Sequence, residues 1–114
     1  VAESGVILAK VTQCKEKGKV KFVGIETGMN SLIRPSLYGA YHEIVNLSRL
    51  YEEKAGFSHI VGPICESGDT LGYDRLLPVT EEGDVLLIAN AGAYGRCMSS
   101  HYNLRPPAQE IIVD

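Results

Sequence analysis

No apolar run in this sequence of 114 residues approaches the roughly 20 residues needed to span a bilayer. The first residues also lack the basic segment and the cleavage site of a secretory signal. Basic charge is in short supply, because 14 Asp and Glu outnumber 11 Lys and Arg and leave a formal net charge of −3. We therefore expect a cytoplasmic protein with neither a membrane nor a nucleic acid as partner.

Cysteine is scarce and follows no pattern. Cys14, Cys65 and Cys97 are an odd number, and their spacing matches no zinc-binding motif, so neither a disulfide framework nor a metal site is predicted. Repeats, low-complexity tracts and Ser/Gly linkers are also missing. Because a chain of this length supports one small core, we predict a single domain over residues 1–114. The chain begins on Val1 instead of Met, and we expect it to be a piece of a longer protein.

Short apolar segments predict strands, and no amphipathic helix of useful length is evident. Residues 5–13 and 20–24 are expected to form a hairpin around a polar turn. The continuous apolar run at 85–89 predicts a strand buried on both faces. Further strands are expected at 44–50, 59–65 and 110–113.

These strands predict an all-β fold, a small Greek-key-like barrel or sandwich. A short helix at 37–44 or 48–55 is left open. Arg34 precedes Pro35 and is expected in a bend or an extended segment, because the residue before proline is pushed out of the helical region.

The polar and reactive residues lie in four loops next to predicted strands, where functional side chains are usually mounted. These loops span residues 28–41, 62–69, 90–95 and 98–105.

Cys65 is followed by Glu66 and, three residues later, by Asp69. Neighbouring negative charge disfavours a thiolate, so Cys65 suits a neutral proton donor better than an attacking nucleophile. The alternative is a small buried hydrophobe at the end of a strand, which is a common position for a free cysteine.

Arg34 offers a guanidinium fork suited to a carboxylate, and the hydroxyl of Tyr38 could bind the same anion. A solvated turn arginine and a packing tyrosine are the alternative. Tyr94 lies in a glycine-rich turn that lets the backbone approach a ligand. His42 and His101 have no second ligand at suitable spacing and are interpreted as structural histidines.

None of the six lysines lies in or next to the loops of Cys65, Tyr94 or Arg34. Chemistry that needs a Schiff-base lysine is therefore not supplied by these loops.

Three motifs taken together carry a specific resemblance that runs from about Gly5 to Asp114. They resemble, in this order, the carboxy-terminal β domain of the fold-type III pyridoxal-phosphate decarboxylases, and within that family the branch that acts on diaminopimelate. The motifs are Thr27–His42 (TGMNSLIRPSLYGAYH), Gly62–Asp69 (GPICESGD) and Ala91–Gly95 (AGAYG). The segments 26–31 and 98–107 are similar to the members of this branch that are fused to an aspartate kinase.

The resemblance implies a homodimer in which an α/β barrel, absent from this chain, holds pyridoxal 5'-phosphate through a lysine. It implies that Cys65 delivers a proton to the α-carbon after carbon dioxide leaves meso-diaminopimelate. Glu66 would bind the distal ammonium of the substrate, and Arg34 and Tyr38 its distal carboxylate. Tyr94 would lie against the cofactor and contact the substrate. The fragment alone is expected to be inactive.

Two alternatives stay open. One is a sister decarboxylase that acts on carboxynorspermidine, ornithine or arginine; the other is a noncatalytic β module that dimerises or regulates. The sequence departs from the family at Asn90, where an aspartate commonly precedes the Ala-Gly-Ala-Tyr-Gly turn.

Overall fold

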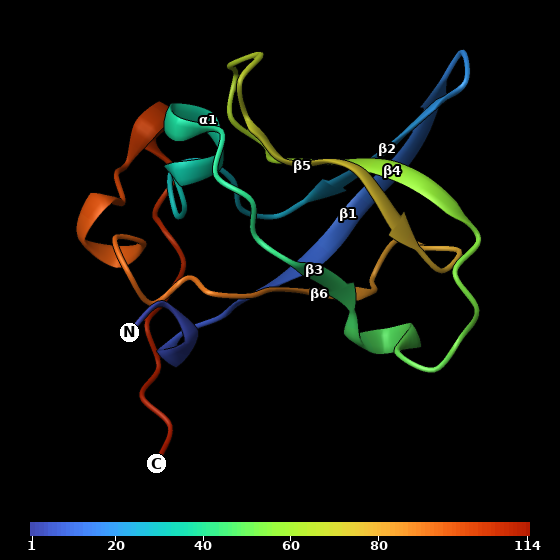
Figure 1. The fold of residues 1–114 in the computed structure, drawn as a ribbon. Coiled ribbons are helices and arrows are strands. Elements are labelled where there is room, and N and C mark those ends of the chain that lie inside the picture. Colours follow the sequence, from blue (N-terminus) through green and yellow to red (C-terminus); the bar gives the residue numbers. More distant parts are fainter.

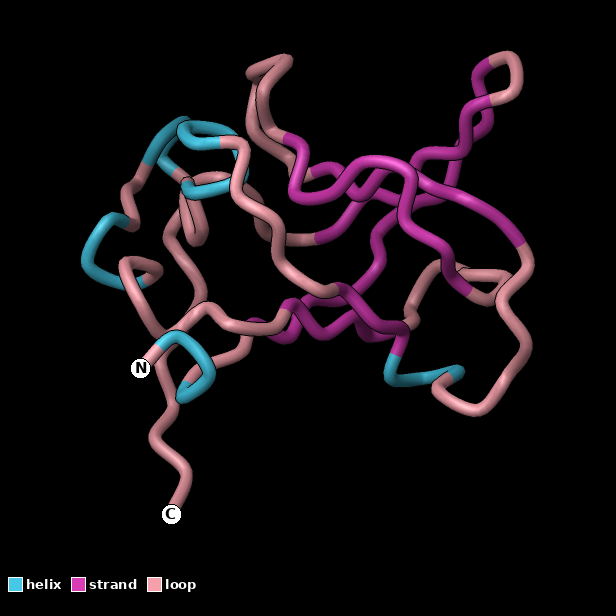
Figure 2. Tube along the Cα trace, in the orientation of Figure 1, coloured by secondary structure: helices cyan, strands magenta, loops and turns pink.

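The computed structural model describes residues 1–114, and its main feature is one curved sheet of six strands (Figure 1, Figure 2). The strands lie side by side in the order β3-β6-β1-β2-β4-β5. Their bounds are β1 Ile7–Lys17, β2 Val20–Ile25, β3 Ile44–Asn46, β4 Gly56–Val61, β5 Thr70–Leu77 and β6 Val85–Ile88. The helical segments are α1 Arg34–Tyr38 and the 3-10 turns η1 Ala2–Ser4, η2 Leu47–Arg49, η3 Arg96–Met98 and η4 Tyr102–Leu104.

Strand β1 joins the two halves of the barrel. Its first part pairs with β6 and its second part with β2, both antiparallel, and the register shifts between Val11 and Gln13. Such an irregularity bends a strand and increases its twist, which helps the sheet to curl. The edge strands β3 and β5 approach each other, and Arg75 of β5 donates a hydrogen bond to the carbonyl of His42 just before β3. The predicted all-β barrel is confirmed.

The core lies inside this curl and is made of aliphatic side chains from all of the strands. On β6, Leu86 and Ile88 are fully buried while Val85 and Leu87 are partly exposed. The strand predicted at 85–89 is therefore confirmed, but its burial on both faces is wrong. The core residues include Ala9, Val11, Val23, Ile25, Leu32, Ile44, Ile60, Leu71, Leu77, Leu86 and Ile88.

Other predicted strands differ from the structure in their bounds. The strand expected at 44–50 ends at Asn46, because the Asn46 side chain accepts the N–H of Arg49 and begins η2. The strand expected at 59–65 runs over Gly56–Val61 instead. Residues 110–113 form no strand and are exposed.

Strand β5 was not predicted from the sequence. Gly72 and the charged pair Asp74 and Arg75 interrupt its apolar alternation, and Asp74 has a left-handed backbone with φ 49°. The strand exists because β4 supplies an antiparallel partner for its backbone. Buried Arg75 also stacks on the ring of Tyr41, with its guanidinium carbon 4.0 Å from the ring centroid.

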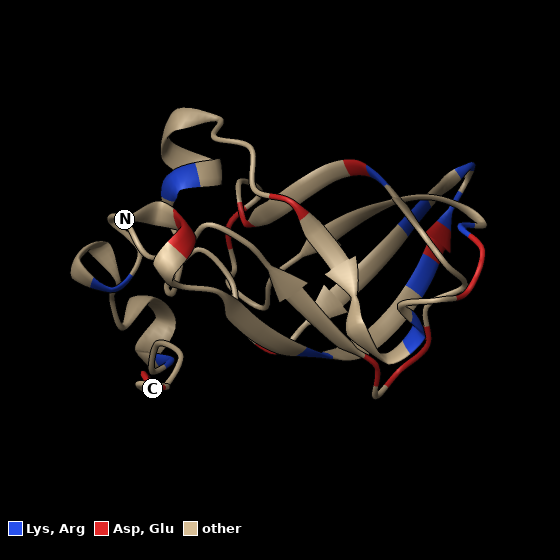
Figure 3. Ribbon diagram, turned by 60° about the horizontal axis from the view of Figure 1, so that its bottom comes forward, with Lys and Arg blue, Asp and Glu red and all other residues tan.

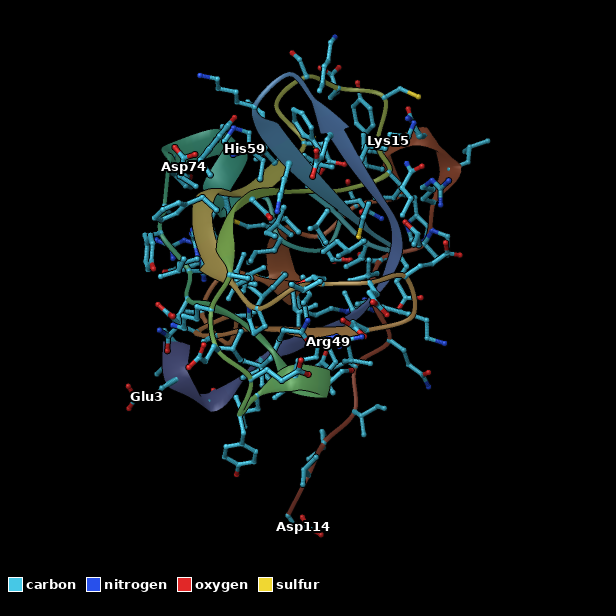
Figure 4. The ribbon with its side chains drawn as sticks, turned by 90° about the vertical axis from the view of Figure 1, so that its right-hand side faces the viewer. Glu3, Lys15, Arg49, His59, Asp74 and Asp114 are labelled. Atoms are coloured by element: carbon cyan, nitrogen blue, oxygen red, sulfur yellow. The ribbon has the colours of Figure 1, made fainter.

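A cluster of charged and polar side chains around Arg49 stabilises the barrel at η2 (Figure 4). The guanidinium of Arg49 donates to Asp84 at 2.7 Å and to Glu81 at 2.9 Å, and Asn46 donates to Asp84 at 3.1 Å. Burial alone would raise the pKa of Asp84, but hydrogen bonds from the Glu81 N–H, Arg49 and Asn46 outweigh it and lower that pKa.

The two ends of the molecule differ in charge and in structure. Lysines gather on the β1–β2 hairpin, whose tip lies far from α1 (Lys15 in Figure 4; Figures 1 and 3). The opposite end carries α1, η3, η4 and both chain termini (Figure 1).

None of the helices has the length and apolar character required to cross a membrane.

Candidate functional site

The short helix α1 begins at Arg34 and ends at Tyr38. It lies at the end of the barrel that also carries η3, η4 and both chain termini (Figure 1). The expectation that Arg34 lies in a bend or extended segment is wrong. Pro35 occupies the first turn of the helix, where its missing N–H leaves no intrahelical bond unmade. Gly39 ends the helix in a left-handed conformation with φ 64°. No residue of α1 is buried; Arg34, Pro35 and Ser36 are partly exposed, and Tyr38 is 64% exposed.

Asp69 anchors the loop that carries Cys65 and Glu66. Its side chain is only 3% exposed, and its two oxygens accept the N–H groups of Met29 and Ile64, each at 2.7 Å. Burial raises the pKa of Asp69, and these two hydrogen bonds offset the rise only in part. Because Asp69 is buried in this way, only Glu66 remains as an exposed carboxylate beside Cys65.

The Asp69 anchor requires two glycines. A Cβ on Gly28 or on Gly62 would overlap the carboxylate of Asp69. The loop and the turn at Gly28 therefore approach each other more closely than larger residues would allow.

Cys65 is exposed, so its interpretation as a small buried hydrophobe is wrong. Its loop touches α1, because the hydroxyl of Ser36 donates to the carbonyl of Gly68. Ser36 lies between Arg34 and Tyr38 on the helix, so the structure brings the two predicted anion-binding residues to the same region as Cys65 and Glu66. No hydrogen bond or ion pair joins the two pairs directly, and Arg34 has no carboxylate partner.

Tyr94 lies in the Ala91–Gly95 turn with its backbone in the left-handed region, φ 57°, and its side chain 66% exposed. Gly95 has no room for a Cβ against the carbonyl of Ala91, and its nearest side chain is Leu32, two residues before Arg34. Asn90 is left-handed as well, with φ 58°. Asparagine tolerates this conformation better than most residues, so the departure at Asn90 is compatible with the turn.

Sequence reasoning missed Tyr102, which the structure places beside Glu66. The Tyr102 hydroxyl donates to Oε1 of Glu66 at 2.6 Å. This hydrogen bond and the charge of Glu66 raise the pKa of Tyr102, with smaller contributions from burial and from Cys65. The two residues are 36 positions apart, and no local pattern in the sequence pairs them.

His42 is buried, with Nδ1 2.9 Å from the carbonyl oxygen of Ala89, whereas His101 is exposed. His42 is thus a buried histidine with one ring nitrogen hydrogen-bonded, whereas its Nε2 is buried without a hydrogen-bond partner. Tyr41 is exposed; its ring stacks with Arg75, and its hydroxyl donates to the carboxylate of Glu43 at 2.9 Å. No group of three His, Cys, Asp or Glu side chains is arranged to hold a metal ion.

The site therefore combines a free guanidinium fork, exposed tyrosine hydroxyls, one carboxylate and one thiol. Such a set can bind a small molecule that carries both a carboxylate and an ammonium, and it can supply a proton. All six lysines lie elsewhere, five on or beside the β1–β2 hairpin (Figure 3).

Comparison with known proteins gives a consistent result. Residues 2–92 match the model of the family described as "Pyridoxal-dependent decarboxylase, C-terminal sheet domain". Diaminopimelate decarboxylase of Aquifex aeolicus is 45% identical over 114 residues, which is 100% of this chain and 27% of the relative. That of Archaeoglobus fulgidus is 44% identical over 113 residues, which is 99% of this chain and 27% of the relative. The chain thus spans about a quarter of the length of these relatives.

Solved structures agree. Diaminopimelate decarboxylase from M. jannaschii in complex with L-lysine superposes with a TM-score of 0.88 at 42% identity, covering 93% of this chain and 24% of that one. A lysine/ornithine decarboxylase from Vibrio vulnificus, complexed with cadaverine, has a TM-score of 0.84 at 21% identity, covering 95% of this chain and 29% of that one. The second likeness shows a shared fold alone.

Proposed function

This chain belongs to the pyridoxal-dependent decarboxylases as their C-terminal sheet domain, and we propose that it completes the active site of a diaminopimelate decarboxylase, which converts meso-diaminopimelate to L-lysine and carbon dioxide. The observation that carries the proposal is the placement of Arg34, Cys65, Glu66 and Tyr94 on neighbouring loops at one end of the barrel. Relatives named diaminopimelate decarboxylase match 99–100% of this chain at 44–45% identity, which supports the same assignment.

The distal end of meso-diaminopimelate carries a carboxylate and an ammonium, and the site offers a partner for each. The guanidinium of Arg34 has no carboxylate partner within the chain, so it is free to bind the carboxylate, with the Tyr38 hydroxyl as a second donor. Glu66 supplies the negative charge for the ammonium. A substrate without this pair of charges, such as ornithine, would leave one of the two partners unmatched.

Cys65 supplies the proton in this proposal. When the bond between the α-carbon and the departing carboxyl group breaks, the electron pair remains with the rest of the substrate. The exposed thiol of Cys65 donates its proton to the α-carbon and recovers a proton from solvent. Because the thiol starts and ends the cycle protonated, no further acid is required from this chain.

The residues present fit one side of pyridoxal 5'-phosphate. Tyr94 presents an exposed ring on a tight left-handed turn, which suits packing against a flat cofactor. The cofactor supplies an electron sink for decarboxylation. With no lysine at this end of the domain, the lysine that holds the cofactor comes from outside these 114 residues. We place it in an α/β barrel elsewhere in the parent polypeptide.

A homodimer is part of the same proposal. The exposed positions of Cys65, Glu66 and Tyr94 leave them open to a second surface, and we assign that surface to the cofactor-bearing barrel of a partner subunit. The three free cysteines are compatible with the reducing cytoplasm expected for such an enzyme.

The test is decarboxylation by the full-length polypeptide that carries this domain. We expect turnover of meso-diaminopimelate, little turnover of ornithine, arginine or carboxynorspermidine, and a loss of about 10²-fold or more in kcat for Cys65→Ala. Cys14→Ala, which alters a thiol on the lysine-rich end, serves as the control. Unchanged kcat in Cys65→Ala would remove the proton-donor role. Absence of both cofactor absorbance and activity in the native protein would favour a noncatalytic β module.

A further inference from the structure

One short turn at Gly28–Ser31 forms hydrogen bonds with two loops that are far apart in the sequence. It thereby fixes the positions of these loops relative to each other. The Met29 N–H in this turn donates to Asp69, which fixes the loop that carries Glu66. The next residue, Asn30, accepts the N–H of Ser100 on its carbonyl at 2.8 Å. One turn therefore bonds to both the loop before β5 and the segment around η4.

Asn30 also holds the chain on the C-terminal side of η4. It is 2% exposed, and its side-chain amide donates to the carbonyls of Arg105 at 3.2 Å and Pro106 at 3.3 Å. Between these two attachments, Asn103 and Leu104 both adopt left-handed backbone with φ near 60°, at 59° and 58°. Asparagine tolerates this backbone, but leucine keeps it only where the surroundings enforce it, and such strain is frequent at functional sites.

The segment held by Asn30 presents the hydroxyl of Tyr102 to Oε1 of Glu66 at 2.6 Å. The other oxygen, Oε2, has no hydrogen-bond partner in the structure. A carboxylate held by one oxygen keeps a fixed orientation while the second oxygen stays available to a cationic ligand. The raised pKa of Tyr102 keeps its hydroxyl protonated, and therefore a donor, across the neutral range.

We propose that Tyr102 is a positioning and specificity-determining residue that orients Glu66 so that its free oxygen binds the distal ammonium of the substrate. This inference rests on the proposed function, because it assigns Glu66 to that ammonium. It adds a residue that acts through Glu66 and a structural reason, the hydrogen bonds of Asn30, for the position of that residue.

The experiment compares two ligands that differ only in the distal ammonium. In L-lysine this group is the α-ammonium, which 6-aminohexanoate lacks. Both ligands keep the carboxylate that corresponds to the distal carboxylate of the substrate. Inhibition constants for both ligands, and KM and kcat for meso-diaminopimelate, are measured on the full-length enzyme and on Tyr102→Phe. We expect L-lysine binding to weaken about tenfold, the KM to rise by a similar factor, and 6-aminohexanoate binding and kcat to change less than about twofold.

Two further variants separate the roles. Tyr102→Phe combined with Glu66→Gln should bind L-lysine no more weakly than Glu66→Gln alone, because both changes act on one interaction. Tyr51→Phe, at a tyrosine that is 98% exposed near η2, is the matched control and should leave both inhibition constants unchanged.

Equal weakening of both ligands by Tyr102→Phe, no change in either, or additive effects in the double variant would overturn the assignment. Failure of the proposed function would look different, because the unaltered full-length protein would then not decarboxylate meso-diaminopimelate at all.

Discussion

Asp69 accepts the backbone N–H of Met29 at 2.7 Å and so joins two loops that are 40 residues apart in the sequence. Its second oxygen accepts the N–H of Ile64 within its own loop. The exposed residues Cys65 and Glu66 follow directly after this anchored point. The buried carboxylate thus sets where these two candidate site residues lie, although it is itself only 3% exposed.

Replacing Asp69 by Asn should disturb the site without removing any reactive group. An amide has one acceptor oxygen for two N–H donors, so one donor loses its partner, at a cost of about 1–3 kcal/mol. We expect faster amide hydrogen exchange in residues 62–69 and a lower kcat/KM in the full-length enzyme. Asp74→Asn on β5, the strand that follows Asp69, is the matched control, because the Asp74 side chain is 79% exposed. Unaltered exchange and activity in Asp69→Asn would contradict the anchoring role.

Gly62→Ala should destabilise the same junction by a steric route. The added methyl group would overlap the Asp69 carboxylate, and overpacking of this kind costs about 1–3 kcal/mol. Gly68→Ala offers a comparison in the same loop, because its methyl group would meet nothing within 4 Å. Thermal unfolding midpoints of the two full-length variants should therefore differ, with Gly62→Ala lower. Equal midpoints would show that the junction can relax.

The Arg49–Asp84 cluster predicts how stability depends on pH. The folded-state pKa of Asp84 is lowered, so its stabilising contribution is present above the unfolded value of about 3.9 and is lost as pH falls through the lower folded value. Asp84→Asn should cost about 1–3 kcal/mol at pH 6, and the difference from the native protein should shrink below about pH 4. Unfolding curves from pH 3 to 7 measure this. A difference that is constant over this range would contradict the prediction.

Arg34→Lys keeps the positive charge and removes the planar fork. If Arg34 binds the distal carboxylate through two donors, the KM for meso-diaminopimelate should rise about tenfold or more, with a smaller effect on kcat. Steady-state kinetics on the full-length enzyme give both values. Arg96→Lys, at an exposed arginine paired with Glu110, should leave KM unchanged. An unaltered KM in Arg34→Lys would assign the carboxylate to another residue.

Local sequence patterns were sufficient for several elements. The hairpin of β1 and β2 and the strand β6 follow from short-range alternation and a compact apolar run. The loops that hold Cys65 and Tyr94 could also be predicted, because glycine and proline mark where strands stop.

Other elements depend on partners that no short window contains. Strand β5 forms against β4 in spite of its polar residues. The predicted strand at 110–113 has the right composition but finds no neighbouring strand to pair with. β-propensity records how well side chains fit a half-buried surface, so it cannot decide whether a pairing partner is available.

The sequence by itself determined the all-β class, the family and the candidate site residues, because these follow from residue types and from motifs in a fixed order. Only the tertiary structure decided that Asp69 is a buried anchor and that Tyr102 lies against Glu66. Both relationships join residues more than 30 positions apart through the turn at Gly28–Ser31. Their geometry is set by the close approach of folded loops, which residue order alone does not encode in any local pattern.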